Sequence, residues 1–350
     1  MSVHNKTAMT RRTLLGAIAT SPLWLQQAQA QPQPQPNNLK ISHQFPAGSI
    51  NLGDFRDRLS RKFAAEVEKR TRGGLKFSIY PGSSLMQPNA QFAALRNGSL
   101  DMALVPLSYA GAQAPEANIG LMPALVTSYQ QGHGWKKAPV GRELSRILAE
   151  QGMVIVSWIW QAGGVASRGA PIINPEDARG LKVRGGSHEM DLLLRDAGAT
   201  VVSMPSNEIH AAMRSGALDA ALTSSTSLIS FRLQETARSL TTARGGAYWF
   251  MFEPLLMSRT VFERLPKSQR EAVLAVGGEL EQFAMEAARM DDAAVASVYR
   301  GVGAKVVDLD AQALRRWQEV ARNTAWKEFG ERNGNCAKLL SLAEQSIAKL

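Results

Sequence analysis

The chain has 350 residues and a formal net charge of +10, with 40 Lys and Arg against 30 Asp and Glu. The basic residues are scattered among the acids and form no basic tract, which argues against a nucleic-acid partner and favours a small anionic one. Cys336 is the only cysteine, so no internal disulfide can form and the fold must rest on its hydrophobic core. We assign Cys336 no role.

Residues 1–30 are typical of an export signal, with a basic start, an apolar run over residues 14–25 and small residues at the end. Arg11 and Arg12 fit the twin-arginine pattern, although an ordinary secretory signal has the same general form. The segment 31–38 (QPQPQPNN) cannot bury apolar surface and predicts a linker. No later stretch approaches the roughly 18 apolar residues that cross a bilayer, so we expect a periplasmic protein.

After the linker, strand and helix patterns alternate. Phe55, Leu59, Phe63 and Val67 are four residues apart, the spacing that lines one face of a helix. The alternation predicts a parallel sheet covered by helices, with right-handed crossovers. The expected elements are strand 39–45, helix 52–72, strand 75–80, helix 87–97 and strand 100–105.

The same order begins again further along the chain, which indicates a second, similar α/β unit. Its expected elements are strand 153–159, strand 181–183, helix 187–197, strand 200–204, helix 207–214 and strand 218–222. Two helices then close the chain, one running to about residue 300 and one over residues 311–332. We expect them to brace both units rather than to form a third domain.

An internal repeat supports two related units: residues 95–104 read LRNGSLDMAL and residues 213–222 read MRSGALDAAL. Each copy predicts a helix that ends at a glycine in the left-handed conformation and an aspartate that leads into a buried strand. Any helix-glycine-strand corner has some of these features, but ten aligned positions favour paired lobes. The matching residues are Gly98 with Gly216 and Asp101 with Asp219.

The sequence contains none of the common catalytic or cofactor motifs. We find no His-Glu-x-x-His, no Gly-x-x-x-x-Gly-Lys, no Gly-x-Ser-x-Gly and no Gly-x-Gly-x-x-Gly. The four histidines after the signal have spacings that suit neither a zinc site nor a catalytic triad. We therefore predict no catalytic residue, no bound metal and no cofactor.

Residues 180–188 (GLKVRGGSH) resemble the signature of the solute-binding proteins of tripartite ATP-independent periplasmic (TRAP) transporters. The resemblance extends upstream through residues 171–177 and downstream through residues 198–219, and it covers nearly the whole chain after the signal. It implies an α/β fold of the two-lobed periplasmic binding protein type (type II-like), with mixed, mainly parallel sheets and a long bracing helix. On this basis we expect lobe I to contain residues 39–160 and about 247–285, and lobe II residues 161–246 and about 286–350.

In that family two lobes close over a carboxylate-bearing solute, and Arg184 matches the arginine that forms a bidentate salt bridge to the carboxylate. A guanidinium suits this role because its planar fork of donors matches two carboxylate oxygens and its charge persists at every working pH. The alternative is that Arg184 merely ends a strand and pairs with a surface acid.

The chain also departs from the family. A second arginine that many members carry is absent from residues 160–167 (WQAGGVAS), where Gln161 instead resembles a ligand-contacting residue of the keto-acid-binding branch. That branch holds a cation through the acid of a Glu-Trp pair that is replaced here by Leu222-Thr223, so the resemblance implies no metal. Thr223, Ser224 and Ser225 offer hydroxyls to an oxygen-rich ligand, although a serine-rich loop is also ordinary.

Further candidates follow from position. Ser108 and Tyr109 follow the first copy of the repeat, as the hydroxyl residues follow the second, and sheets of this kind bind ligands beyond the carboxyl ends of their strands. Trp160, Trp249 and Phe250 flank the expected crossover strands, where each ring lines the cleft or packs in the core.

We therefore expect a periplasmic receptor that captures a small organic acid by lobe closure and delivers it to the membrane permease subunits of a TRAP-type transporter. The missing second arginine favours a monocarboxylate or a keto or hydroxy acid, with dicarboxylates still open. Two alternatives remain: an exported periplasmic enzyme, and a ligand-binding sensor module for a receptor kinase.

Overall fold

The structure is a computed structural model that describes residues 37–348, which form one compact unit. The predicted export signal and most of the predicted linker lie outside the described residues. None of the described helices combines the length and the apolar character that a membrane span requires.

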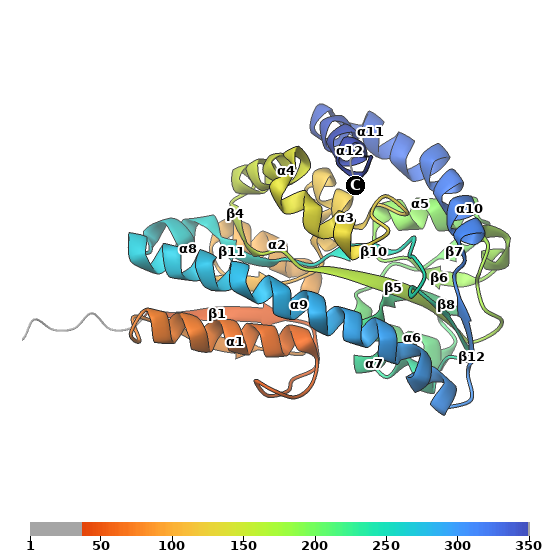
Figure 1. The fold of residues 1–350 in the computed structure, drawn as a ribbon, viewed down its shortest axis with the longest axis horizontal. Helices are drawn as coiled ribbons and strands as arrows, with labels where there is room; N and C mark the ends of the chain where they lie inside the picture. The colour runs from red at the N-terminus through yellow and green to blue at the C-terminus, as the bar shows by residue number, and fades with distance from the viewer. Residues whose placement is uncertain (1–36, 349–350) are drawn as a thin grey trace, which may run out of the picture. The chain divides into compact units, whose positions relative to one another are not determined.

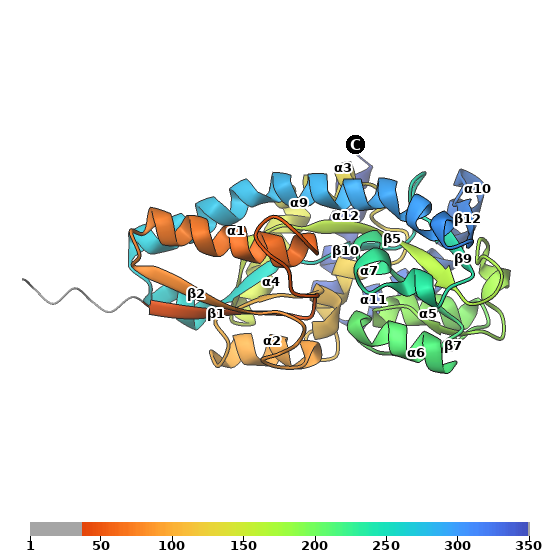
Figure 2. The same ribbon diagram turned by 90° about the horizontal axis from the view of Figure 1, so that it is seen from below.

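The first sheet has five strands in the order β2-β1-β3-β11-β4, and we call it, with its helices, lobe I. Figure 2 shows α1 and α9 (Lys267–Gly301) on one face of β1 and β2 and α2 on the other. The face of α1 predicted from its spacing is buried, since Phe55, Leu59, Phe63 and Val67 all lie in one hydrophobic cluster. The bounds are β1 (Asn37–His43), α1 (Phe55–Arg70), β2 (Leu75–Tyr80), α2 (Pro88–Asn97), β3 (Met102–Leu104), β4 (Met153–Ser157) and β11 (Leu255–Ser258).

The second sheet follows the order β12-β9-β5-β8-β6-β7, with β10 paired to β5, and we call it, with its helices, lobe II. Strand β7 is shorter than expected: the chain leaves the sheet after Val201 and reaches Pro205, which has no N–H to donate to a ladder. The bounds are β5 (Trp160–Ser167), β6 (Lys182–Arg184), α5 (His188–Asp196), β7 (Thr200–Val201), α6 (Ile209–Ser215), β8 (Ala220–Ser224), α7 (Ser225–Ser230), β9 (Ser239–Thr242), β10 (Phe250–Phe252) and β12 (Lys305–Asp308).

The repeat marks the same corner in each lobe. Gly98 and Gly216 end their helices at φ 76° and φ 80°, the left-handed conformation that the sequence predicts. Asp101 Oδ2 accepts the backbone N–H of Lys40 at 2.8 Å, and Asp219 Oδ2 accepts that of Lys182 at 2.8 Å. Each aspartate therefore joins the strand that follows its corner to the neighbouring parallel strand.

Both sheets are mixed and mainly parallel, as the sequence predicts, with one reversed strand in each. Parallel pairing holds between β1, β2 and β3, between β6, β7 and β8, and between β9 and β12, whereas β11 and β5 pair antiparallel with both of their main neighbours. These two strands belong to the crossings between lobes, and each enters its sheet against the direction of the parallel strands. The chain returns from lobe II to lobe I between β10 and β11, because β10 pairs with β5 of lobe II and β11 pairs with β3 and β4 of lobe I. This return crossing lies inside the segment predicted for lobe I.

The long helix α9 (Lys267–Gly301) packs on α1 and β4 of lobe I and on α7, β9 and β12 of lobe II. Figure 1 shows it running past α1 and on towards α7. It is the bracing helix predicted from the sequence, and it continues without a break through residue 285, where the lobes were expected to divide.

The predicted helix 311–332 is continuous but changes winding at a π-helical turn, Arg322–Trp326. Several short helices in lobe I and the last helix of the chain were not predicted. The remaining helices are α3 (Tyr129–Gly134), α4 (Pro139–Glu150), α8 (Arg259–Arg264), α10 (Ala311–Ala321), α11 (Lys327–Arg332) and α12 (Gly334–Ile347), with the 3₁₀ helices η1 (Leu107–Ala110), η2 (Pro115–Leu121), η3 (Trp135–Lys137), η4 (Pro175–Ala178), η5 (Ser206–Glu208) and η6 (Leu233–Glu235).

Candidate ligand-binding site

Arg184 is the last residue of β6, and its side chain is only 2% exposed. Its Nε donates to the carbonyl oxygen of Met204 at 3.1 Å and its Nη1 to that of Leu222 at 2.8 Å. Its Nη2 lies 3.0 Å from the hydroxyl oxygen of Tyr109, which belongs to lobe I. The predicted arginine is thus held by two carbonyls of its own lobe and touches the other lobe.

Two N–H groups of the Arg184 guanidinium are left over from these hydrogen bonds. Arginine has five N–H groups, and these three hydrogen bonds use one on Nε and one on each terminal nitrogen. One N–H therefore remains on Nη1 and one on Nη2 for a ligand. The described residues provide no carboxylate partner for Arg184 within ion-pair distance, so it is not the surface ion pair of the alternative interpretation.

Two hydrogen bonds join the loop after β6 to lobe I. Ser108 Oγ, in η1, donates to the carbonyl oxygen of Gly186 at 3.1 Å. Ser187 Oγ donates in the opposite direction, to the carbonyl oxygen of Leu121 at 3.0 Å. Ser108, predicted from its place after the first repeat, is therefore one of the residues that join the two lobes beside Arg184.

Trp249 lies against the same loop. Its indole Nε1 donates to the carbonyl oxygen of Gly185 at 2.8 Å. The ring fits because residue 163 is glycine: a Cβ there would lie 2.2 Å from Trp249 Cε3 and 2.4 Å from the carbonyl oxygen of Thr223. Two predicted site residues, Trp249 and Thr223 through its backbone carbonyl, thus lie close to Gly163, and Trp249 also contacts the loop after Arg184.

Gln161 lies in a second buried polar cluster. Its side-chain amide donates to Glu253, whose Oε2 is also 3.4 Å from Arg56 Nη1. Arg56 forms a two-armed contact with Asp54, at 2.9 Å from Nε and 2.6 Å from Nη2. Arg56 Nη1 also donates to Ser227 Oγ of α7 at 3.0 Å, so this cluster joins lobe I to lobe II.

The electrostatics of this second cluster are strongly perturbed. Burial raises the pKa of Glu253 to about 7, although the charge of Arg56 opposes the shift. Burial also acts to raise the pKa of Asp54, but the charge and hydrogen bonds of Arg56 bring it below its ordinary value. Ser224 connects to the cluster, because its Oγ donates to Ser227 Oγ at 3.0 Å and caps α7.

Trp160, Phe250 and Ser225 lie away from Arg184. The ring of Trp160 packs at 5.1 Å from those of Trp135 and Phe252, and Phe250 packs edge-on at 5.0 Å from Tyr129. Trp160 therefore packs in a core, whereas Phe250 and Tyr129 also line a separate hollow of about 530 Å³ together with Arg289. Ser225 is buried at the start of α7.

A hollow of about 570 Å³ lies between the lobes and borders the Arg184 contacts. Ser108, Tyr109, Gly186 and Met204 line its inner side. Asp191 also lines it, and burial raises the pKa of this carboxyl to about 6 against the opposing charges of Arg184 and Arg195. Sequence reasoning did not single out Asp191, because an acid in the first turn of a helix is ordinary.

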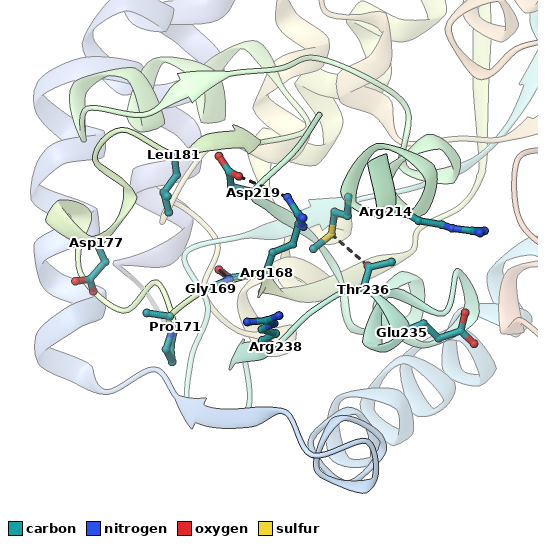
Figure 3. A pocket seen from close by; sticks show the side chains of 13 residues that line it. Arg168, Gly169, Pro171, Asp177, Leu181, Arg214, Asp219, Glu235, Thr236 and Arg238 are labelled. Atoms are coloured by element: carbon teal, nitrogen blue, oxygen red, sulfur yellow. Dashed lines mark hydrogen bonds and ion pairs between the residues drawn. The ribbon is translucent and has the colours of Figure 1, made fainter. Parts of the chain in front are cut away.

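A larger hollow, of about 700 Å³, lies at the other end of lobe II, where β5 ends and β6, β8 and β9 begin (Figure 3). Arg168 there is paired with Asp219 at 3.9 Å, and Arg214 extends away from the hollow. Arg168, Arg214 and Arg238 are all exposed, so solvent and salt screen their charges. The buried arginine between the lobes is therefore the stronger candidate for holding an anion.

The described residues contain no group of three or more His, Cys, Asp or Glu that could hold a metal ion. Two α/β lobes joined by crossing strands, with a buried arginine where they meet, define a two-lobed ligand-binding protein. The chain belongs to the bacterial extracellular solute-binding proteins, family 7, whose sequence model matches residues 54–333. The predicted family resemblance and the two-lobed α/β fold are thereby confirmed, and this family consists of receptors rather than enzymes.

Known relatives agree with this assignment. A solute-binding protein of Albidiferax ferrireducens is 62% identical over 344 residues, which cover 97% of this chain and 100% of the relative. The crystal structure of a TRAP periplasmic solute-binding protein from Rhodoferax ferrireducens, with bound malonate, has a TM-score of 0.88 and 65% identity, covering 89% of this chain and 98% of that one. A C4-dicarboxylate-binding periplasmic protein of Rhodobacter capsulatus is 22% identical over 277 residues, 78% of this chain and 82% of the relative.

Proposed function

We propose that this chain is exported to the periplasm, binds a short carboxylic acid between its lobes through Arg184, and delivers it to the membrane permease of a TRAP-type transporter. The observation that carries the proposal is the buried guanidinium with one N–H left on each terminal nitrogen. A carboxylate is the ligand group whose two oxygens match that pair of donors.

The class of solute is inferred from residues 160–167 of this chain and from the ligand of a similar solved structure. The absence of a second arginine in residues 160–167 favours a monocarboxylate or a keto or hydroxy acid. The relative with 65% identity holds malonate, a short dicarboxylate, and this closer likeness has more weight. We therefore place a short dicarboxylate of the malonate type first and short keto and hydroxy acids second.

Binding and closure support each other in this arrangement. Arg184 and Trp249 belong to lobe II and its crossing, whereas Ser108 and Tyr109 belong to lobe I, so the wall around the carboxylate is complete only when the lobes meet. Closing also excludes water, and an ion pair is screened less there than at a surface. The two strand crossings, β4 to β5 and β10 to β11, are the connections about which such a hinge would bend.

The test is a thermal-shift and calorimetric screen of residues 31–350 against malonate, succinate, pyruvate and lactate. A ligand at 100 times its dissociation constant should add roughly 2.7 kcal/mol of stability. The shift should disappear in Arg184→Ala. It should survive in Arg238→Ala, which removes an exposed arginine of the same lobe at the distant hollow. A shift that survives Arg184→Ala would contradict the proposed site.

A further inference from the structure

Tyr109 is the only side chain of lobe I, among the described residues, that forms a hydrogen bond with Arg184. It lies in η1, directly after the repeat corner and strand β3. Its hydroxyl oxygen accepts an N–H from Arg184 Nη2 at 3.0 Å and the backbone N–H of Ser206 at 2.9 Å, both from lobe II. Gln44 Nε2 is at 3.5 Å, the outer limit of a hydrogen bond.

These two short contacts use both lone pairs of the phenol oxygen but leave its own hydrogen free. Within residues 37–348, no acceptor for the Tyr109 O–H is found apart from the side-chain amide of Gln44 at 3.5 Å, the outer limit of a hydrogen bond. A hydroxyl that accepts from a cationic donor is polarised and becomes a stronger donor itself. An unused, strengthened O–H therefore lies next to the two unused N–H groups of Arg184.

The hollow between the lobes lies beside these donors. Tyr109 lines that hollow together with Ser108, Gly186 and Met204, and Arg184 contacts Met204 through its carbonyl oxygen. A solute that reaches Arg184 from the hollow passes the Tyr109 hydroxyl. Under the proposed function, the group that meets this hydroxyl is the carboxylate assigned to Arg184.

We propose that the Tyr109 hydroxyl donates a hydrogen bond to the carboxylate held by Arg184, and so makes recognition depend on closure. This inference rests on the proposed function and assigns a further specificity residue to that site. Lobe II supplies the two N–H donors and lobe I supplies the O–H, so the carboxylate receives all three only in the closed form. A neutral group in place of the carboxylate lacks the acceptor that the three donors require.

The experiment compares the malonate dissociation constants of wild type, Tyr109→Phe and Tyr299→Phe by calorimetry. Loss of a hydrogen bond to a charged group predicts a weakening on the order of tenfold or more for Tyr109→Phe. Tyr299 is the control, because its buried hydroxyl is 3.5 Å from the carbonyl oxygen of Leu228, away from Arg184. Tyr299→Phe should keep the wild-type constant.

A double-mutant comparison separates contact with the ligand from support of Arg184. If Tyr109 only holds the guanidinium in place, Tyr109→Phe should cost nothing further in an Arg184→Lys background, and that result would overturn the proposal. If it donates to the carboxylate, a loss of several-fold or more should persist there. Unchanged or tighter binding by Tyr109→Phe alone also overturns it. Failure of wild type to bind any of the acids would instead count against the proposed function.

Discussion

The indole N–H of Trp249 donates a 2.8 Å hydrogen bond to the carbonyl oxygen of Gly185, the residue that follows Arg184. The backbone carbonyl of Trp249 in turn accepts the N–H of Gly163 at 3.0 Å. Trp249, which precedes the return crossing from lobe II to lobe I, therefore contacts both strand β5 and the loop that follows Arg184. This links the position of Arg184 to the strands that cross between the lobes.

The first prediction follows from that contact. Trp249→Phe keeps most of the ring but leaves the buried Gly185 carbonyl without its partner, which should cost about 1–3 kcal/mol in the free energy of unfolding. The affinity for malonate should fall as well, because the loop behind Arg184 is released. Urea unfolding and calorimetry measure the two effects.

Trp326→Phe is the matched control for this prediction. The indole of Trp326 donates to the carbonyl oxygen of Pro123 at 2.8 Å, so the same type of bond is lost away from Arg184. This variant should lose stability but keep its affinity. Equal losses of affinity in both variants would show that the effect of Trp249 is general destabilisation.

The second prediction concerns Gly186, which has φ 102°, a conformation that side chains rarely adopt. A Cβ at this position would lie 2.7 Å from Arg184 Nη1, so Gly186→Ala should displace the guanidinium and weaken malonate binding at least tenfold. Gly180→Ala is the control, since Gly180 has φ 74° but open space around its Cβ position. It should lose roughly 1–2 kcal/mol of stability and keep its affinity. Malonate binding by Gly186→Ala at the wild-type affinity would refute the close packing of residue 186 against Arg184.

The sequence predicted those parts of the site that local pattern determines. The repeat placed Gly98 and Gly216 at equivalent corners, and the strand before the glycine pair placed Arg184 at the carboxyl end of β6. Both depend on neighbours within a few residues, where glycine, aspartate and apolar spacing have direct conformational consequences.

The other parts of the site could not be predicted, because they depend on contacts between residues far apart in the sequence. Arg56 and Glu253 are 197 positions apart, and Gln161 and Glu253 are 92 apart, so neither partner could be inferred from the other. The crossing strands β10 and β11 are short apolar runs, which periodicity alone does not distinguish from other buried segments. Trp160 and Trp249 look alike in sequence, yet one packs in a core and the other holds the loop behind Arg184.

The third prediction tests the second buried cluster. Arg56→Met removes the only cation that faces Asp54 and Glu253 among the described residues, and leaves buried carboxyl groups without compensation. Breaking a buried pair in this way should lower the free energy of unfolding by about 3–5 kcal/mol. Arg70→Met, which removes a partly exposed arginine paired with Glu66 and Glu279, should change it little. Urea unfolding of both variants measures these changes in the free energy of unfolding. A loss of stability in Arg56→Met as small as that in Arg70→Met would contradict the role of Arg56.

The fourth prediction is a pH dependence centred on Glu253. Its folded-state pKa of about 7 lies above the ordinary 4.5, so ionisation opposes folding: the penalty is absent below about pH 4.5, grows as the pH rises and is complete above pH 7. Glu253→Gln removes the penalty. Relative to wild type, it should therefore gain stability between pH 4.5 and pH 8, by about 3 kcal/mol at most. Exposed Glu271→Gln should follow the wild-type curve. A Glu253→Gln curve parallel to wild type over this range would show that Glu253 ionises normally in the folded protein.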